Sequence, residues 1–357
     1  MKVLTVVGAR PQFVKAAPVR RALEAAGHTE FLVHTGQHYD DALSAAQFRD
    51  LELTSPHVNL GIGSGRHGAQ TARMLARLEE IIIEQVPDWV LVYGDTNSTL
   101  AGALAAVKLR VPVAHVEAGQ RSYNRCMPEE INRVTTDHVS DLLLCSTSTA
   151  VANLAAEGIH AHVHMVGDVM IDALAWILQR TQDPGARARM GLEAGRYLLV
   201  TVHRAENTDN VARLRAILMG LEELDEPVVF PVHPRTRKVL DAVAWAPPPH
   251  LRLIEPVGYR DMIELERDAR MILTDSGGMQ KEAYFLGVPC VILRDETEWV
   301  EIVESGWGVL VGADADRIRS AVRSARPGSA RPALHGDGHA APRCVTQMEQ
   351  AWAGRAR

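Results

Sequence analysis

This chain of 357 residues is poor in cysteine and contains no long hydrophobic run. Its cysteines show neither a CxxC pair nor a metal-ligand spacing, so we expect reduced thiols, a cytoplasmic protein and no metal site. The apolar run at residues 3–7 has the length of one strand. It is too short for a signal peptide, and no run approaches a membrane span. The four cysteines are Cys126, Cys145, Cys290 and Cys344.

The chain also lacks an excess of one charge and the common nucleotide-binding motifs. Its 38 basic and 44 acidic residues give a formal net charge of −6. This balance does not indicate binding to nucleic acid or to an anionic membrane. No GxxxxGK[ST] or GxGxxG motif occurs, and the glycine-rich stretch 61–70, which follows no predicted strand, is interpreted as a loop. Neither a P-loop nor a dinucleotide site is therefore supported.

Apolar strand-like runs alternate with helical segments along most of the chain. This alternation indicates parallel sheets covered by helices, and the length allows two domains. We therefore predict an α/β protein with two Rossmann-like, doubly wound domains that face one another across a cleft. The N-terminal domain takes residues 1–178 and the C-terminal domain residues 197–342, joined by a polar linker at 179–196. Residues 343–357 form a C-terminal helical segment.

Two acidic residues follow two successive predicted strands of the N-terminal half. Asp95 follows the run 90–93, and Glu117 follows the run 112–116. Ligands of parallel sheets bind at the carboxyl ends of the strands, where a pair of acids suits proton transfer. Asp95 alone could equally be a helix cap or part of a turn. The two strands are either direct neighbours or separated by one strand.

Basic residues occupy other strand ends of the predicted sheets. Arg10 and Lys15 lie near the start of a helix, where a cation is unfavourable against the helix dipole. They form either an anion site with the helix N-terminus or a solvated pair of charges. His203 and Arg204 end a strand of the second half and are candidates for binding a diphosphate.

The motif Asp-Ser-Gly-Gly at residues 275–278 is the most specific phosphate signal in the second half. Here a strand ends, two glycines expose backbone N–H groups, Ser276 adds a hydroxyl, and a helix begins. Glu282, one turn later, could bind a ribose diol or lie exposed on the helix. Glu129 in the first turn of another helix could be functional, or could simply complement the helix dipole.

Eight sequence blocks resemble the non-hydrolysing UDP-N-acetylglucosamine 2-epimerases, in order and approximate spacing, from residue 1 to about 325. The blocks are GARPQFVK, VYGDTNST, HVEAGQRS, MPEEINR, VTVHRAEN, PVHP, LTDSGG and LRDETEW. The resemblance implies the glycosyltransferase-B architecture, with the active site between two Rossmann-like domains and a C-terminal helix that returns to the first. It also implies a homodimer that uses neither nicotinamide nor metal.

The activity implied by this resemblance is inversion at carbon 2 of UDP-GlcNAc to give UDP-ManNAc. The family eliminates UDP to form 2-acetamidoglucal and then adds it back. The resemblance makes Asp95, Glu117 and Glu129 the acid/base carboxylates, and leaves open which one takes the carbon-2 proton. It adds Lys15 and His203 to the catalytic residues. The implied substrate contacts are Arg10, Lys15, Arg133, His203, Val257, Met262, Ser276, Gly277, Gly278, Glu282 and Arg294.

Several alternatives share this scaffold. They are a 2-epimerase of a modified sugar such as UDP-2,3-diacetamido glucuronic acid, a hydrolysing epimerase, a glycosyltransferase and a non-enzymatic UDP-sugar sensor. The chain also departs from the family pattern. Gln12 and Lys281 stand where glutamate is usual, and residues 295–299 read DETEW rather than the start of DTTERP. Residues 37–41 read QHYDD, unlike the Gln-His-x-x-Met segment that binds an activating substrate molecule in some members.

Overall fold

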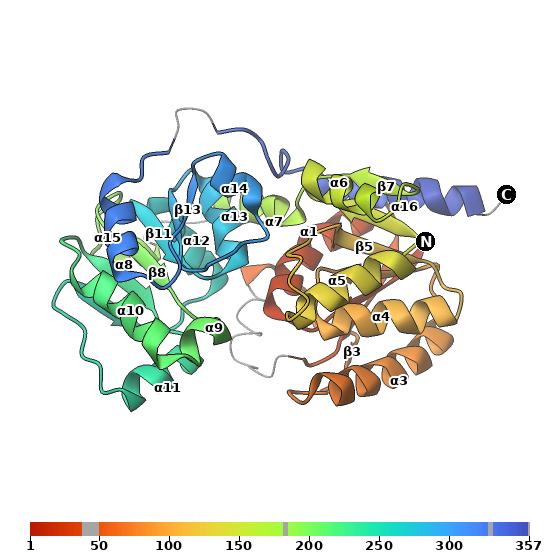
Figure 1. Cartoon of the computed structure of the whole chain (residues 1–357). Helices are drawn as coiled ribbons and strands as arrows, with labels where there is room; N and C mark the ends of the chain where they lie inside the picture. The colour runs from red at the N-terminus through yellow and green to blue at the C-terminus, as the bar shows by residue number, and fades with distance from the viewer. Residues whose placement is uncertain (38–49, 181–184, 328–330, 356–357) are drawn as a thin grey trace. The chain divides into compact units, whose positions relative to one another are not determined.

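The computed structural model describes residues 1–37, 50–180, 185–327 and 331–355 (Figure 1). The chain forms two compact units. One comprises Met1–Trp176 together with His335–Arg357, and the other comprises Ile177–Leu334. Each unit contains one parallel sheet with helices, so the predicted α/β class with two doubly wound sheets is confirmed.

The first unit contains a seven-stranded parallel sheet with the order β3-β2-β1-β4-β5-β6-β7. The direction of winding reverses between β1 and β4, which are direct neighbours. Strands β4 and β5 are also direct neighbours, which decides the spacing left open by the sequence. The strands are β1 (Lys2–Val7), β2 (Thr29–His34), β3 (Val58–Asn59), β4 (Trp89–Tyr93), β5 (Val113–Ala118), β6 (Leu142–Cys145) and β7 (Val163–Met165).

Buried aliphatic side chains on both faces of the central strands explain why these segments form an interior parallel sheet. Helices α3 and α4 pack on one face, where Met74 and Leu78 contact a cluster that includes Val6 and Val92. The helices are α1 (Arg10–Ala25), α3 (His67–Gln85), α4 (Asn97–Lys108), α5 (Pro128–Val139), α6 (Ser148–Ala156), α7 (Val169–Leu178) and α16 (Ala340–Arg355).

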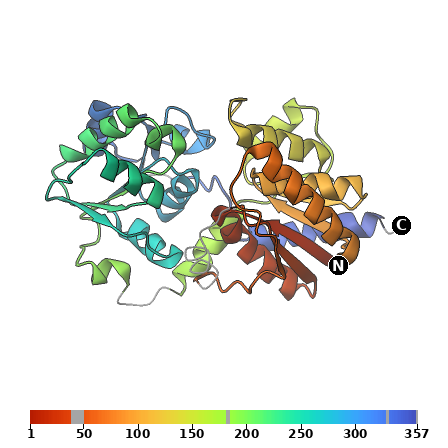
Figure 2. The same cartoon turned by 90° about the horizontal axis from the view of Figure 1, so that it is seen from below.

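The C-terminal helix α16 belongs to the first unit and packs against α1 (Figure 2). Cys344 and Met348 bury their side chains completely. The carboxylate of Asp172 in α7 accepts hydrogen bonds from the backbone N–H groups of Ala340 and Ala341 at 3.1 and 2.8 Å, which caps α16. The chain rejoins the first unit at residue 335, earlier than the expected boundary at 343.

The second unit contains a six-stranded parallel sheet with the order β10-β9-β8-β11-β12-β13. Its winding reverses between β8 and β11, which are direct neighbours. The strands are β8 (Leu198–Thr201), β9 (Val228–Pro231), β10 (Leu251–Ile254), β11 (Met271–Thr274), β12 (Cys290–Ile292) and β13 (Gly308–Leu310). The helices are α8 (Ala186–Arg189), α9 (Ala205–Thr208), α10 (Val211–Glu222), α11 (Pro234–Ala242), α12 (Tyr259–Asp268), α13 (Gly277–Leu286), α14 (Val300–Glu304) and α15 (Ala315–Ser324).

Three segments differ from the sequence-based expectation. The described part of the expected linker carries α8, and the backbone N–H groups of Ala186 and Arg187 donate to Glu264, so this stretch is folded into the second unit. Helix α3 begins at His67, inside the stretch expected to be a loop. Strand β5 extends through Glu117 to Ala118, because a β-bulge shifts its register at this point. The sequence also predicts a helix from about residue 41 to Leu51, and most of it lies outside the described residues.

Candidate functional site

Glu117 occupies a bulge at the carboxyl end of β5. The pairing of β5 with β6 shifts register between Val116 and Ala118, and Glu117 has a φ of 69°. A left-handed φ is costly for a residue with a Cβ and is sustained only when the surrounding structure enforces it. Bulges of this kind redirect a side chain and are common beside active sites. The bulge therefore holds Glu117 in an uncommon backbone conformation at the end of β5.

The ammonium group of Lys15 forms an ion pair with the Glu117 carboxylate. Lys15 comes from α1, and both side chains are largely buried, with exposed fractions of 9% and 12%. The Lys15 ammonium also lies 3.3 Å from the position a Cβ would take at Gly94, the residue before Asp95. The structure therefore brings the predicted cation to the ends of β4 and β5. Arg10 begins α1, but its side chain lies outside the described part of the chain.

The carboxylate of Asp95 pairs with Arg133. The Arg133 Nε donates to Asp95 Oδ2 at 3.0 Å, and its Nη1 donates to Glu130 at 2.7 Å. Asp95 keeps 35% of its side chain exposed, so a ligand can reach it. Glu129 is half-buried in the first turn of α5, four residues before Arg133, and so lies on the same helix face. Each acid of β4 and β5 thus has its own cation.

Gln12 joins the loop after β1 to the end of β4. Its amide oxygen accepts from the N–H groups of Gly8 and Ala9 at 2.7 and 3.0 Å. Its amide nitrogen donates to the Tyr93 carbonyl at 2.8 Å and to Thr99 Oγ1 at 3.0 Å. A glutamate, usual here in the family that the sequence resembles, could donate neither of the last two bonds when ionised and only one of them when protonated. The amide therefore suits the donors and acceptors around this buried position.

His115 and Asp137 form a buried pair behind the strand ends. His115 Nδ1 lies 2.7 Å from Asp137 Oδ1, and His115 Nε2 lies 2.7 Å from the Gly94 carbonyl. Asp137 Oδ2 accepts from the N–H of Gly119 at 3.0 Å and from Arg121 at 2.7 Å. Burial opposes ionisation of Asp137, but the charges and hydrogen bonds of His115 and Arg121 outweigh it and lower the pKa of Asp137.

In the second unit, Asp275 organises the loops that follow β8 and β11. Its buried carboxylate accepts from the backbone N–H groups of His203 and Arg204, at 3.1 and 3.0 Å, and from Asn207. The His203 Nδ1 also lies 3.3 Å from Asp275 Oδ1. Because β8 and β11 are neighbours, these contacts hold His203 beside the Ser-Gly-Gly segment. The His203 side chain remains 40% exposed.

The Ser-Gly-Gly segment begins α13 as predicted. Ser276 is the N-cap, and Gly277 is the first residue of the helix. A Cβ on Gly277 would lie 3.2 Å from the indole nitrogen of Trp299 and 3.7 Å from an Arg204 guanidinium nitrogen. The helix N-terminus, an indole N–H and a guanidinium therefore surround Gly277, which suits an anion. Trp299 belongs to the DETEW segment at residues 295–299, which differs from the family pattern. The ammonium nitrogen of Lys281 lies 4.1 Å from the centre of the Trp299 ring.

Glu282 is buried rather than exposed on the surface of α13. Its Oε1 accepts from the hydroxyl of Tyr259 at 2.7 Å. Desolvation, followed by the negative charge of Glu282, raises the pKa of the buried Glu266 carboxyl well above its ordinary value.

The remaining predicted substrate contacts of the second unit are Val257, Met262 and Arg294. Val257 and Met262 are half-buried and pack against the hydrophobic cluster around Leu265. Arg294 is buried, and its guanidinium donates to both carboxylate oxygens of Glu298 at 2.8 and 3.3 Å. It therefore has a fixed partner within the protein.

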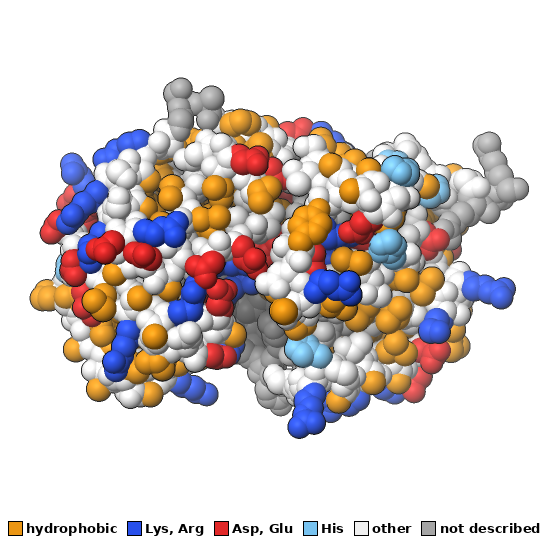
Figure 3. Space-filling model, viewed as in Figure 1, with side chains coloured by type: hydrophobic (Ala, Val, Ile, Leu, Met, Phe, Trp, Pro, Cys, Tyr) orange, Lys and Arg blue, Asp and Glu red, His pale blue; other side chains and the backbone are white. Residues whose placement is uncertain are grey.

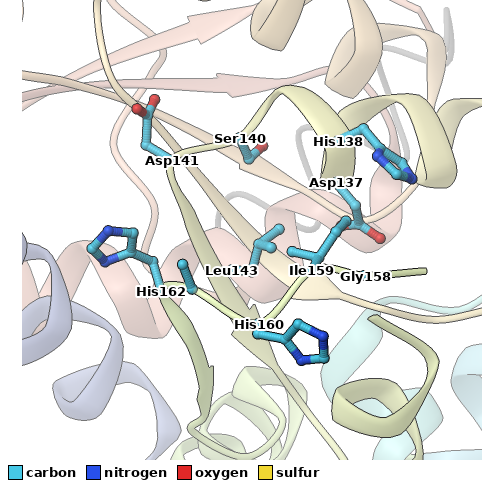
Figure 4. Close-up of a pocket in the computed structure, with 10 residues that line it drawn as sticks. Asp137, His138, Ser140, Asp141, Leu143, Gly158, Ile159, His160 and His162 are labelled. Atoms are coloured by element: carbon cyan, nitrogen blue, oxygen red, sulfur yellow. The ribbon is translucent and has the colours of Figure 1, made fainter. Parts of the chain in front are cut away.

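A separate cavity of about 510 Å³ opens at the other edge of the first sheet (Figure 4). It borders the segments that precede β6 and β7, so it lies at the amino ends of these strands and includes none of the predicted site residues. It is lined by Asp137, His138, Ser140, Asp141, Leu143, Gly158, Ile159, His160, Ala161 and His162.

Three further observations concern metal binding, membrane insertion and surface charge. Within the described ranges, no group of His, Cys, Asp and Glu is arranged to hold a metal ion. None of the helices in the described part of the chain is long and apolar enough to cross a membrane. Acidic and basic side chains are interspersed on the face seen in Figure 3.

Sequence reasoning missed several residues that shape these loops. Gln12 stands out in the sequence only as a departure from the family, and Asp137 carries no local signal of its role. The signal for His115 was present, because a histidine inside the apolar run VAHV must find polar partners when the strand is buried. No local pattern could show that Trp299 approaches Gly277, because this contact depends on the tertiary structure.

Comparison with known proteins identifies relatives along nearly the whole chain. The family model for UDP-N-acetylglucosamine 2-epimerase matches residues 21–349. A UDP-N-acetylglucosamine 2-epimerase homolog of Methanococcus maripaludis is 50% identical over 335 residues, which cover 92% of this chain and 94% of the relative. The UDP-2,3-diacetamido-2,3-dideoxy-D-glucuronate 2-epimerase of Pseudomonas aeruginosa is 49% identical over 332 residues, 91% of this chain and 92% of the relative.

A solved structure has the same fold over its full length. The UDP-GlcNAc 2-epimerase of Methanocaldococcus jannaschii, crystallised in complex with UDP-GlcNAc and UDP, superposes with a TM-score of 0.92. It shares 41% sequence identity, and the match covers 98% of this chain and all of that one.

Proposed function

This chain belongs to the UDP-N-acetylglucosamine 2-epimerase family, and we propose that it interconverts UDP-GlcNAc and UDP-ManNAc without hydrolysis. The protein is an epimerase, and its reaction is an isomerisation at carbon 2 of the sugar. The observation that carries the proposal for this chain is the pair of acids on neighbouring strands, Glu117 held by Lys15 and Asp95 held by Arg133.

We assign the acid/base steps to the first unit. Anti elimination breaks the bond between carbon 1 and the UDP oxygen while a carboxylate takes the proton from carbon 2. UDP then adds back to carbon 1 of 2-acetamidoglucal, and carbon 2 is protonated on the opposite face. Inversion requires acids on two faces of the sugar, and Asp95, Glu117 and Glu129 supply them. The ammonium group of Lys15 contacts the Glu117 carboxylate directly.

UDP binding is assigned mainly to the second unit. We propose that the N-terminus of α13, with Ser276, Gly277 and Gly278, binds the diphosphate with His203. In the first unit, we propose Lys15 and Arg10 as further substrate contacts. Backbone N–H groups and cations stabilise the negative charge that develops as UDP leaves. The half-buried Val257 and Met262 suit the face of a uracil ring, and Glu282 suits the ribose hydroxyls. We propose Arg294 as a further substrate contact.

Proton NMR of the protein with UDP-GlcNAc alone in deuterated water tests this proposal. We expect UDP-ManNAc to appear and deuterium to enter carbon 2 of both sugars, with no net release of UDP. Stoichiometric accumulation of UDP and free ManNAc would instead identify a hydrolysing epimerase. Turnover only after addition of a sugar acceptor would identify a glycosyltransferase, and binding without any reaction would identify a sensor.

A second candidate substrate is UDP-2,3-diacetamido-2,3-dideoxy-D-glucuronate. The relative that carries this name is 49% identical to this chain, almost as similar as the UDP-N-acetylglucosamine 2-epimerase homolog at 50%. The same NMR experiment with each nucleotide sugar separates the two. If kcat/KM is higher for the uronate than for UDP-GlcNAc, the uronate is the preferred substrate.

We also propose that the enzyme is a cytoplasmic homodimer. The four free cysteines support a reducing compartment. The family resemblance supports the dimer, and the first unit exposes Ile83 and Val86 by 62% and 77% at the end of α3. Sedimentation equilibrium of the purified protein should give twice the 39.1 kDa chain mass, and a monomer mass would reject the dimer.

A further inference from the structure

One stripe of helix α5 contacts the ends of both acid-bearing strands. Glu129, Arg133 and Asp137 follow one another at intervals of four residues, so their side chains share one face of the helix. Arg133 contacts the Asp95 carboxylate, and Asp137 lies one turn further along. The helix therefore carries a chain of polar groups behind the loops that present Asp95 and Glu117.

Asp137 reaches the loop of Asp95 through His115. One ring nitrogen of His115 lies 2.7 Å from Asp137, and the other lies 2.7 Å from the carbonyl of Gly94. Gly94 has a φ of 61° and immediately precedes Asp95. The Asp137–His115 pair therefore holds the carbonyl at the turn that directs Asp95 away from the strand.

The same carboxylate reaches the loop of Glu117 directly. Asp137 Oδ2 accepts the N–H of Gly119 at 3.0 Å, two residues after Glu117. Gly119 has a φ of 80°, and the bulge residue Glu117 has a φ of 69°. An uncommon backbone conformation persists only where neighbouring contacts hold it, and the bond from Gly119 to a buried carboxylate is such a contact.

Asp137 is held in turn by contacts on its outer side. Arg121 donates to Asp137 at 2.7 Å and forms a two-pronged contact with Glu157 at 2.6 and 2.8 Å. Asp137 and His115 have fully buried side chains, so each hydrogen bond lost here leaves a polar group without water. The network therefore links the Asp137 carboxylate to the ends of both strands through hydrogen bonds.

We propose that Asp137 is a positioning residue of the epimerase, which sets the separation and direction of the Asp95 and Glu117 carboxylates through His115 and Gly119. Asp137 itself touches no substrate. This inference rests on the proposed function, since it assigns a role in the same acid/base chemistry. A displacement of about 1 Å in a catalytic group can lower the rate on the order of 100-fold.

The test compares Asp137→Ala with the conservative Asp137→Asn variant. In Asp137→Ala we expect kcat to fall on the order of 100-fold, while KM and the Kd of UDP change by less than about threefold. In Asp137→Asn the amide oxygen still accepts from Gly119, the amide nitrogen donates to His115 Nδ1, and His115 Nε2 still donates to Gly94. We expect this variant to regain most of the lost kcat.

Asp141→Ala provides the matched structural control. Asp141 Oδ2 accepts the N–H of Val113 at 2.9 Å, so it makes the same kind of contact at the opposite end of the same strand. We expect Asp141→Ala to lower thermal stability, though less than Asp137→Ala, and to leave kcat nearly unchanged. Equal kcat losses in Asp137→Ala and Asp141→Ala, or a UDP Kd that weakens in parallel with kcat, would overturn the positioning role.

His115→Phe tests the inference independently if Asp137→Ala does not fold. It removes the link to Gly94 and keeps the ring volume and the bond between Asp137 and Gly119. Reduced kcat with unchanged UDP affinity supports the proposal, and wild-type kcat rejects it. Deuterium exchange by the wild-type enzyme is measured first, because its absence would reject the proposed function, whereas normal exchange in every variant would reject only the positioning role.

Discussion

At the scale of single residues, each of the two strand-end acids faces its own cation. Lys15 pairs with Glu117, and Arg133 pairs with Asp95. Asp95 and Glu117 lie on neighbouring strands, and each follows or occupies an unusual backbone conformation. These features single out the two acids for a test by substitution.

Asp95→Asn and Glu117→Gln should each lower kcat on the order of 100- to 10,000-fold, because each replaces a proton-transfer group with an amide of the same shape. UDP affinity should change little, since the residues proposed to bind the diphosphate lie mainly in the second unit. NMR turnover and calorimetric titration with UDP measure the two effects. Near-normal turnover in either variant would remove that acid from the mechanism.

Glu30 should make stability depend on pH. Desolvation raises its pKa from 4.5 to about 7, although Thr5 donates a hydrogen bond to it and Arg20 lies nearby. Between pH 4.5 and 7 the folded protein holds a proton that the unfolded chain has lost, so stability falls as pH rises through this window. The loss should reach about 3 kcal/mol above pH 7.

Glu30→Gln should remove this pH dependence while keeping the acceptor for Thr5. Urea unfolding at pH 5 and pH 8 measures the effect, and the variant should gain stability relative to wild type at pH 8. An identical pH dependence in both proteins would show that Glu30 ionises normally in the folded state.

At the scale of elements, the bulge of β5 depends on the close approach of helix α6. A Cβ on Gly119 would lie 2.4 Å from the carbonyl oxygen of Ala150, and Gly119 has a φ of 80°. No side chain fits this position without displacing the helix backbone. The glycine therefore holds the strand end that carries Glu117 against α6.

Gly119→Ala should lower the free energy of unfolding by about 2 to 5 kcal/mol, through backbone strain combined with the clash. Gly158→Ala is the matched control, because Gly158 has a φ of 81° and the described residues place no atom within 4 Å of where its Cβ would lie. It should cost only about 1 to 2 kcal/mol for the left-handed backbone. Thermal unfolding of both variants measures the difference, and equal losses would show that packing against α6 contributes nothing.

At the scale of the whole molecule, the first unit is closed by the last part of the chain. Helix α16 packs against α1, and Asp172 caps its first residues. The second unit is continuous from Ile177 to Leu334 and has its own hydrophobic core. The two units should therefore respond differently to removal of the C-terminal segment.

A chain that ends at Leu334 should have a strongly destabilised first unit. Cys344 and Met348 are fully buried, and loss of each such contact costs about 2 kcal/mol. The second unit should still unfold cooperatively and still bind UDP. Calorimetric scans with and without UDP measure both transitions. If the first unit unfolds at the same temperature in the truncated chain and in the full-length chain, α16 does not stabilise the first unit.

The sequence by itself determined much of this protein. The alternation of apolar runs and helices predicted two parallel sheets, and the ends of the strands that precede Asp95 and Asp275 were correctly located. The motifs sufficed to identify the family, because they combine local turn chemistry with order along the chain. The functional roles of the site residues remain predictions for experiment.

Only the tertiary structure decided which groups meet. The neighbouring positions of β4 and β5, the left-handed Glu117, its pairing with Lys15 and the Asp137 network were not evident from local patterns. A turn or a cap depends on residues a few positions apart, and the sequence displays these directly. Contacts between distant segments arise from the register of strands and the packing of helices, so they exist only once the chain has folded.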